Sequence, residues 1–275
     1  DGDENEQIYR IGTDNREVMP VVYHPRNVRS HLGDVSGDWV YYASNKRLRC
    51  IFDICRKNLL NGKTDILIEG KDAVCLPLSI SPDEEILLYS RRTSFADMQI
   101  YCKNLHTGEE RKVSKEQQCA MEESPAWLGD GSGFYFISDR EREFKRVLFW
   151  DRETGQTQEI YEVDWDVTHI AVSKDDRYLA VVVNEDGDSG IHILETASKK
   201  EIKIPQIPLG TIGDEEPVTW SETGYRLLFS FESGSRTQNI WLLDAEEGTL
   251  KQVTENENMT VGQDALVEPV LCRYQ

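Results

Sequence analysis

The sequence has no run of about 20 consecutive apolar residues, which a membrane-spanning helix would need. Basic residues are also scarce, with 31 Lys and Arg against 50 Asp and Glu and a formal net charge of −19. Such a surface repels phosphate backbones, so we expect no nucleic acid and no membrane among its partners. An acidic surface is usually just solvated, and the alternative is a specific cationic partner.

Cysteine is sparse too, with six residues in a chain of 275. This density is too low for a small scaffold built on disulfides. The closest pair, Cys50 and Cys55, lacks the C-x-x-C spacing of redox and zinc sites. We interpret the cysteines as reduced thiols of a cytoplasmic protein. An extracellular protein with one or two disulfides is the alternative.

The sequence lacks the motifs of a hydrolase nucleophile and of a phosphate-binding loop. No serine has Gly at both −2 and +2, the pattern of the α/β-hydrolase nucleophile. The Gly-rich stretch GDGSG at 129–133 stands between two apolar segments, whereas a phosphate-binding loop precedes a helix. We therefore expect no catalytic residue and no cofactor in this chain.

What the sequence does contain is a repeat. Apolar–Ser or Trp–Leu anchor pairs recur at intervals of 45, 47, 45 and 48 residues, and their second residues are Ser36, Ser81, Leu128, Ser173 and Ser221. An acidic or Gly-bearing turn follows each anchor. Then come a dense apolar segment, such as EILLYS at 85–90, a third apolar segment, such as NIWLLDA at 239–245, and a weaker fourth.

This repeat predicts an all-β fold. The segments are short and rich in β-branched and aromatic residues, which favours strands. The second segment of each unit is apolar at successive positions, so both of its faces must be covered. Four strands per unit at this period are typical of a propeller blade, and single blades must stack to bury their faces. A β-sandwich, the alternative, would alternate more and lack the repeat.

We predict one β-propeller domain over residues 1–275, with five full four-stranded antiparallel blades and an incomplete sixth. The full blades are expected at 31–70, 75–116, 121–163, 167–205 and 214–256. Residues 7–23 match the third and fourth strands of a partial blade. Residues 257–275 form either a closing strand or a linker.

Several stretches resemble known propeller repeats. SPDEEILLYS (81–90), QIYCKNLHTGEERKVS (99–114) and NIWLLDAEEGTLKQVT (239–254) resemble TolB-like propellers and equally the N-terminal propeller of prolyl-oligopeptidase-family serine peptidases. Residues 7–47, with HP at 24–25 and SN at 44–45, favour the peptidases. VEPVLCRYQ (267–275) is similar to the linker that leads there into an α/β-hydrolase domain.

The resemblance implies a non-catalytic domain that gates peptide access to a hydrolase domain outside this sequence. The family's catalytic triad lies in that hydrolase domain, so no triad residue is carried over. The implied partners are the hydrolase domain of the same parent chain and peptide substrates. Two alternatives remain open: a stand-alone TolB-like propeller acting as a protein- or ligand-binding scaffold, and a metal-dependent propeller enzyme.

One stretch fits the spacing of a calcium loop. In NEDGDSGIHILE, oxygen-bearing residues stand at positions 1, 3, 5, 7 and 12, namely Asn184, Asp186, Asp188, Gly190 and Glu195. Position 6 is Ser189 instead of the Gly that permits the sharp turn, and no flanking helices are expected. An ordinary acidic hairpin loop is the alternative.

A second candidate is acidic. Asp214, Glu215 and Glu216 precede the Trp220 anchor, and some relatives of the family hold a peptide amino terminus with paired propeller carboxylates. A merely solvated loop is the alternative. The five histidines, at 24, 31, 106, 169 and 192, show no ligand-like spacing, so we expect no zinc or manganese site.

Overall fold

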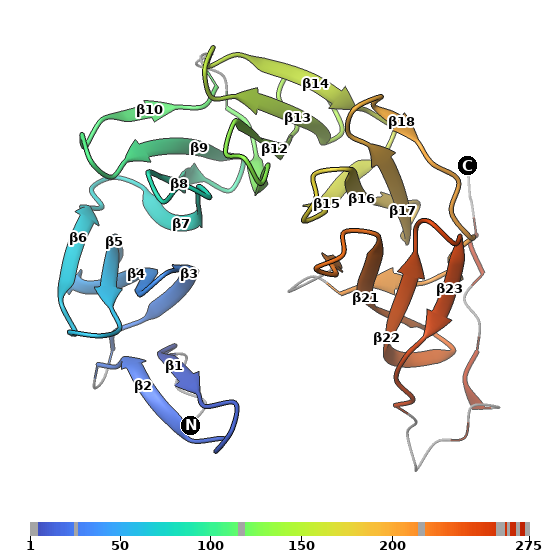
Figure 1. Ribbon diagram of the computed structural model, residues 1–275, viewed down its shortest axis with the longest axis horizontal. Helices are drawn as coiled ribbons and strands as arrows, with labels where there is room; N and C mark the ends of the chain where they lie inside the picture. Colours follow the sequence, from blue (N-terminus) through green and yellow to red (C-terminus); the bar gives the residue numbers. More distant parts are fainter. Residues whose placement is uncertain are drawn as a thin grey trace. The chain divides into compact units, whose positions relative to one another are not determined.

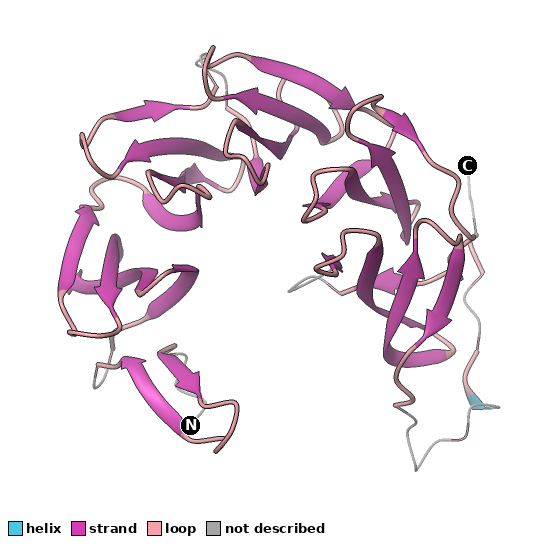
Figure 2. Cartoon of the chain, in the orientation of Figure 1, coloured by secondary structure: helices cyan, strands magenta, loops and turns pink. Residues whose placement is uncertain are grey.

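The computed structural model describes residues 5–24, 27–114, 119–213, 218–256, 262, 265–267 and 270–272 (Figure 1). Strands are the only long regular elements in these ranges, which contain no α-helix (Figure 2). The same ranges hold no helix of the length and hydropathy that crossing a membrane requires. The chain divides into two compact units, residues 1–125 with 150–157 and residues 126–149 with 158–275.

The N-terminal part of the chain forms a hairpin and two four-stranded sheets. The antiparallel hairpin joins β1 (Ile8–Ile11) and β2 (Val18–Val22). The first sheet follows chain order through β3 (Ser30–Ser36), β4 (Trp39–Leu48), β5 (Ile51–Asn58) and β6 (Thr64–Ile68). The second does the same through β7 (Val74–Ile80), β8 (Ile86–Ser94), β9 (Asp97–Asn104) and β10 (Glu110–Lys112).

Three more sheets follow. The third consists of β11 (Glu122–Trp127), β12 (Gly133–Ser138), β13 (Arg146–Asp151) and β14 (Thr157–Tyr161). The fourth consists of β15 (Asp166–Val172), β16 (Tyr178–Glu185), β17 (Asp188–Glu195) and β18 (Lys200–Glu201). In the fifth, two short strands both pair with the same neighbour: β19 (Thr211–Ile212), β20 (Val218–Trp220), β21 (Arg226–Ser233), β22 (Arg236–Asp244) and β23 (Thr249–Gln252).

The second strand of a sheet is buried on both faces, as the continuous apolar runs predict. In β16, Tyr178, Ala180 and Val182 belong to a core cluster with residues of β21. The alternate residues Leu179 and Val181 belong to a different cluster with residues of β12. Since successive side chains of a strand point to opposite faces, β16 is covered on both sides by neighbouring sheets of its unit.

A recurring turn explains the serine of the repeat. After Ser81, Ser173 and Ser221, the N–H of the anchor donates to the carbonyl oxygen five residues later. The anchor hydroxyl accepts the N–H of that same later residue, at 2.9, 2.9 and 3.3 Å. Leu128 closes an equivalent turn with the backbone bond alone. Ser36 differs, because it pairs directly with Trp39 across a two-residue turn.

Replacing an anchor serine should therefore destabilise the protein. Ser81 is 1% exposed, and its hydroxyl also donates to Asp83 Oδ1 at 2.5 Å. Ser81→Ala removes the acceptor of the Ile86 N–H and keeps only the bond from the Ser81 N–H to the Ile86 carbonyl, so we expect a loss of about 1–2 kcal/mol of unfolding free energy. Urea unfolding followed by circular dichroism measures it. The exposed control Ser198→Ala should change stability by less than about 0.5 kcal/mol, and equal losses in both variants would contradict the role of the turn.

All six cysteines lie in the described part of the chain, and none forms a disulfide there. Three are exposed, and Cys55, Cys75 and Cys102 are buried. Burial raises the pKa of the Cys55 thiol to about 11 and that of Cys102 to about 12. These two side chains are protonated at neutral pH and act as small apolar groups of the core.

Candidate functional site

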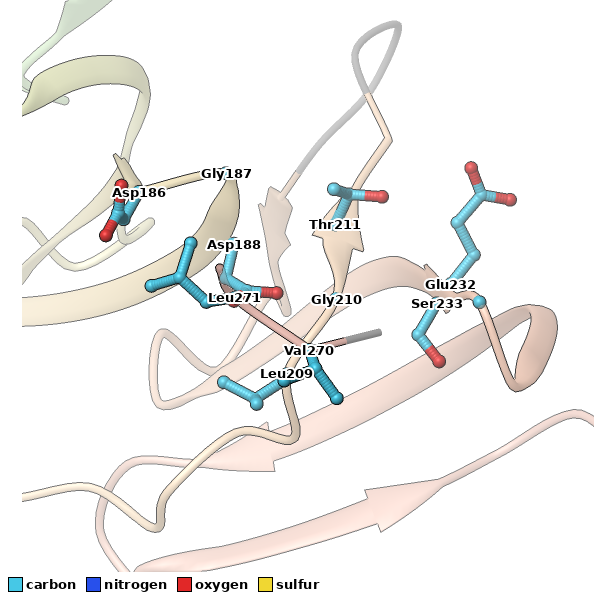
Figure 3. Close-up of a pocket in the computed structure, with 11 residues that line it drawn as sticks. Asp186, Gly187, Asp188, Leu209, Gly210, Thr211, Glu232, Ser233, Val270 and Leu271 are labelled. Atoms are coloured by element: carbon cyan, nitrogen blue, oxygen red, sulfur yellow. The ribbon is translucent and has the colours of Figure 1, made fainter. Parts of the chain in front are cut away.

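The candidate site is a pocket of about 400 Å³ in the second unit (Figure 3). Its walls come from two hairpin turns and from two segments outside the repeat. The first runs from Asp186 to Asp188, the first residue of β17, and the second runs from Glu232, near the end of β21, to Gly234. The segments are Leu209–Thr211 and the pair Val270 and Leu271.

The first wall is a tight hairpin turn. Glu185 pairs with Asp188, so only Asp186 and Gly187 lie in the turn. Their φ values are +60° and +98°, as in a type I′ turn, for which Asp-Gly is a favoured sequence. Asn184 Oδ1 accepts the Gly187 N–H at 3.0 Å and fixes the turn further. The sequence thus places two carboxylates, those of Asp186 and Asp188, at one edge of the pocket (Figure 3).

The second wall is held between two sheets of the same unit. The Ser189 N–H donates to the Gly210 carbonyl at 2.7 Å, and the Ile212 N–H donates to Ser189 Oγ at 3.0 Å. On the other side, Thr211 pairs with Glu232. A Cβ at Gly210, whose φ is +154°, would lie 2.3 Å from the Glu232 carbonyl oxygen. Only glycine fits this position.

The pocket is acidic and partly apolar. Its lining includes the acidic residues Asp186, Asp188 and Glu232, and no Lys, Arg or His is among the described residues of the lining. Leu209, Val270 and Leu271 are 59%, 79% and 59% exposed. A ligand with a cationic head and an apolar body would complement such a surface.

The predicted calcium ligands are not brought together. Asp186 and Asp188 share the turn, but Glu195 pairs with Tyr178 at the far end of the same hairpin. Glu195 is about 23 Å from Asp188 along the extended strand, at about 3.3 Å per residue. In the part of the chain that the structure describes, no group of three or more His, Cys, Asp or Glu side chains could hold a metal ion.

The other predicted acidic residues, Asp214, Glu215 and Glu216, lie outside the described residues. Their neighbour Gly213 donates its N–H to the Ser230 carbonyl at 3.3 Å. Thr211, three residues before Asp214, lines the pocket. In the sequence, the acidic segment therefore follows shortly after a residue of the pocket lining.

The histidines do not gather in the described chain. His192 lies between two carboxylates, with Nε2 at 2.8 Å from Glu185 Oε1 and Nδ1 at 2.8 Å from Glu201 Oε1. His31 contacts Glu6.

Sequence reasoning missed the wall opposite the Asp186–Asp188 turn. Glu232 lies at the end of β21, the second strand of its sheet, and Asp186 directly follows β16, so this similar position in the repeat could have pointed to Glu232. Leu209 and Gly210 lie outside the repeat, and their position depends on β19, a strand of only two residues. No signal in the sequence marks that strand.

Comparison with known proteins agrees with this architecture. The structure is similar to TolB from Acinetobacter baumannii, with a TM-score of 0.63 and 17% identity over 89% of this chain and 61% of that one. It is also similar to a puromycin-hydrolyzing peptidase from Mycobacterium tuberculosis, with a TM-score of 0.72 and 13% identity over 93% of this chain and 43% of that one. A further puromycin hydrolase structure gives a TM-score of 0.77 at 13% identity, over 94% and 43%.

The chain thus spans about three fifths of that TolB and less than half of either hydrolase. No curated protein is significantly similar to it in sequence. The predicted all-β propeller fold is confirmed by these likenesses together with the four-stranded antiparallel sheets. A family described as prolyl oligopeptidase, N-terminal beta-propeller domain, matches residues 36–209. Because this match covers more than half of the chain, the chain belongs to the family of N-terminal β-propeller domains of prolyl oligopeptidases.

Proposed function

We propose that this chain is a non-catalytic propeller that gates peptide access to an α/β-hydrolase domain of the same parent protein. The family match over residues 36–209 is the observation that carries the proposal. The structural match covers 43% of the length of the puromycin hydrolases, so those proteins have room for a second domain, which supports the proposal. The propeller would act on access and supply none of the reacting groups.

Within this function, the acidic pocket would hold the amino terminus of an entering peptide. An ammonium group carries three N–H donors, which suit carboxylate acceptors. Neither Asp188 nor Glu232 has a salt-bridge partner in the described part of the chain, so both can accept such a group. Leu209, Val270 and Leu271 would contact the first apolar side chains of the peptide.

A peptide pair tests the pocket. The tripeptide amide Ala-Phe-Leu-amide has a free amino terminus, and its N-acetylated form has none. We expect calorimetric titration to give at least about tenfold weaker binding after acetylation, and the same loss for the free peptide with Asp188→Asn/Glu232→Gln. The control Glu255→Gln removes an exposed carboxylate outside the pocket and should leave affinity unchanged. Equal binding of both peptides would refute the pocket assignment.

A separate test addresses the non-catalytic role of the chain. Purified chain should not react with a fluorophosphonate probe that labels active serine hydrolases, whereas the full parent protein should. Labelling of this chain alone would contradict the non-catalytic role. An unlabelled parent would favour the second candidate, a stand-alone binding scaffold, which the similarity to TolB supports.

A further inference from the structure

The first unit contains a second pocket, of about 480 Å³, whose character is opposite to that of the acidic one. It lies between the end of β2 and the first four-stranded sheet, with lining residues from β4, β5 and β6. Its wall carries four basic side chains and one acidic one, which are Lys46, Arg47, Lys57, His24 and Asp53. In a chain with a formal net charge of −19, this gathering of positive charge requires an explanation.

One of the basic groups is already neutralised. Arg47 donates from Nε and Nη2 to the two carboxylate oxygens of Asp53, at 2.8 and 2.7 Å. The same Nη2 also donates to the Gly70 carbonyl. This ion pair neutralises Asp53, which is the only acid among the described residues of the pocket wall.

The two lysines are not neutralised. Neither Lys46 nor Lys57 has a carboxylate within ion-pair distance in the part of the chain that the structure describes. Lys57 Nζ donates to the Val21 carbonyl at 2.6 Å, which fixes the ammonium group against the β2 side of the pocket and leaves it two more N–H donors. Fifty acidic residues are available in the chain, yet none pairs with these two lysines among the described residues.

The positive charges of Lys46 and Lys57 both act on the imidazole of His24. The pKa of His24 is lowered from its ordinary value by burial first, and then by the positive charges of Lys46 and Lys57. Both lysines therefore lie close enough to His24 to place it in a positive potential. A bound anion would relieve this potential.

The remaining lining is suited to an organic body. Tyr42 is 4% exposed and Tyr23 is 57% exposed, and both line the pocket together with Val22. We propose that this pocket binds a small organic anion, with a carboxylate or phosphate group held by Lys46 and Lys57 and an apolar or aromatic body against Tyr23 and Tyr42. This assignment does not depend on the proposed peptidase role.

Two matched ligands test the charge requirement. Benzoate and benzamide have nearly the same shape, but only benzoate carries a negative charge. Titration of the full 275-residue chain, followed by calorimetry, should show at least about tenfold stronger binding of benzoate. Phenyl phosphate in a parallel titration identifies the group, since stronger binding than benzoate indicates a phosphate ligand and weaker binding a carboxylate. Equal affinities for benzoate and benzamide would overturn the proposal.

Variants locate the site. Lys46 is exposed, so Lys46→Gln is not expected to disturb folding, and Lys57→Gln is added to it. The double variant should bind benzoate at least about tenfold more weakly. The control Lys63→Gln removes a nearby lysine that is paired with Asp65 outside the pocket, and should bind benzoate as the unaltered chain does. Unchanged affinity in Lys46→Gln alone and in the double variant would refute the site.

His24 supplies a readout that unspecific charge attraction would not give. An anion between the lysines raises the lowered pKa of His24, so binding takes up a proton and should strengthen as the pH falls from 7.5 to 5.5. Benzoate stays ionised over this range. The other titratable groups among the described lining residues are Tyr23, Tyr42, Lys46, Arg47, Asp53, Cys55 and Lys57. His24→Gln should abolish the pH dependence, and an unchanged slope in that variant would contradict the proposed position of the anion.

Discussion

Trp220→Ala is expected to lower the free energy of unfolding by about 3–5 kcal/mol. Trp220 ends β20, is 6% exposed, and belongs to the core cluster that joins β16 to β21. Its ring stacks on Tyr178 with centroids 5.9 Å apart and an interplanar angle of 20°. Its indole N–H donates to the Ala171 carbonyl at 2.9 Å. The substitution would leave a large cavity and would remove the indole donor from the Ala171 carbonyl.

The measurement is urea unfolding followed by far-ultraviolet circular dichroism, because tryptophan fluorescence changes with the substitution itself. Trp220→Phe keeps an aromatic ring but loses the N–H donor, so it should cost only about 1–2 kcal/mol. Trp165→Ala is the matched control, since Trp165 is 37% exposed and should cost less than Trp220 does. Equal effects of Trp220→Ala and Trp165→Ala would contradict a packing role for the Trp220 anchor.

Trp220 illustrates why the architecture could be predicted. It occupies an anchor position of the repeat, and its hydrogen bond reaches Ala171, which is two residues before the preceding anchor Ser173. The anchor turn itself depends on contacts over five residues, as at Ser173, and is therefore encoded locally. The apolar run of β16 is equally local, because burial of both faces leaves no position for a polar residue.

The fourth strands were harder to place. β18 contains only Lys200 and Glu201, and β10 contains only three residues. Both consist of exposed or half-buried polar residues, so few side chains there can stabilise strand pairing by packing. The first anchor also deviates, because Gly37, with a φ of +51°, closes a shorter turn than the other anchors do.

The candidate site could be predicted only in part. An acidic hairpin loop was the alternative to a calcium loop at 184–195, and the strand register has a hairpin turn at Asp186–Gly187. The same register places Glu195 at the far end of the hairpin from that turn. Glu232 and Leu209 reach the same pocket only through the pairing of β19 with β21. Such non-local pairing leaves no spacing pattern in the sequence.

Glu122→Ala is also expected to lower the free energy of unfolding by about 3–5 kcal/mol. Glu122 starts β11 and is completely buried, with 0% exposure. One carboxyl oxygen accepts the Ile100 N–H of β9 at 2.9 Å, and the other accepts the Ser114 hydroxyl. Truncation leaves two buried donors without this acceptor, and each such donor costs about 1–3 kcal/mol.

Three measurements separate this linkage from simple loss of volume. Glu122→Gln keeps one acceptor oxygen but turns an NH₂ group toward the other donor, so it should lie between the unaltered chain and Glu122→Ala in urea unfolding. Glu109→Ala removes an exposed carboxyl group nearby and should cost less than about 0.5 kcal/mol. Hydrogen exchange of the Ile100 amide should accelerate in Glu122→Ala, because its acceptor is gone. Unchanged protection of that amide would mean that Glu122 does not link β9 to β11.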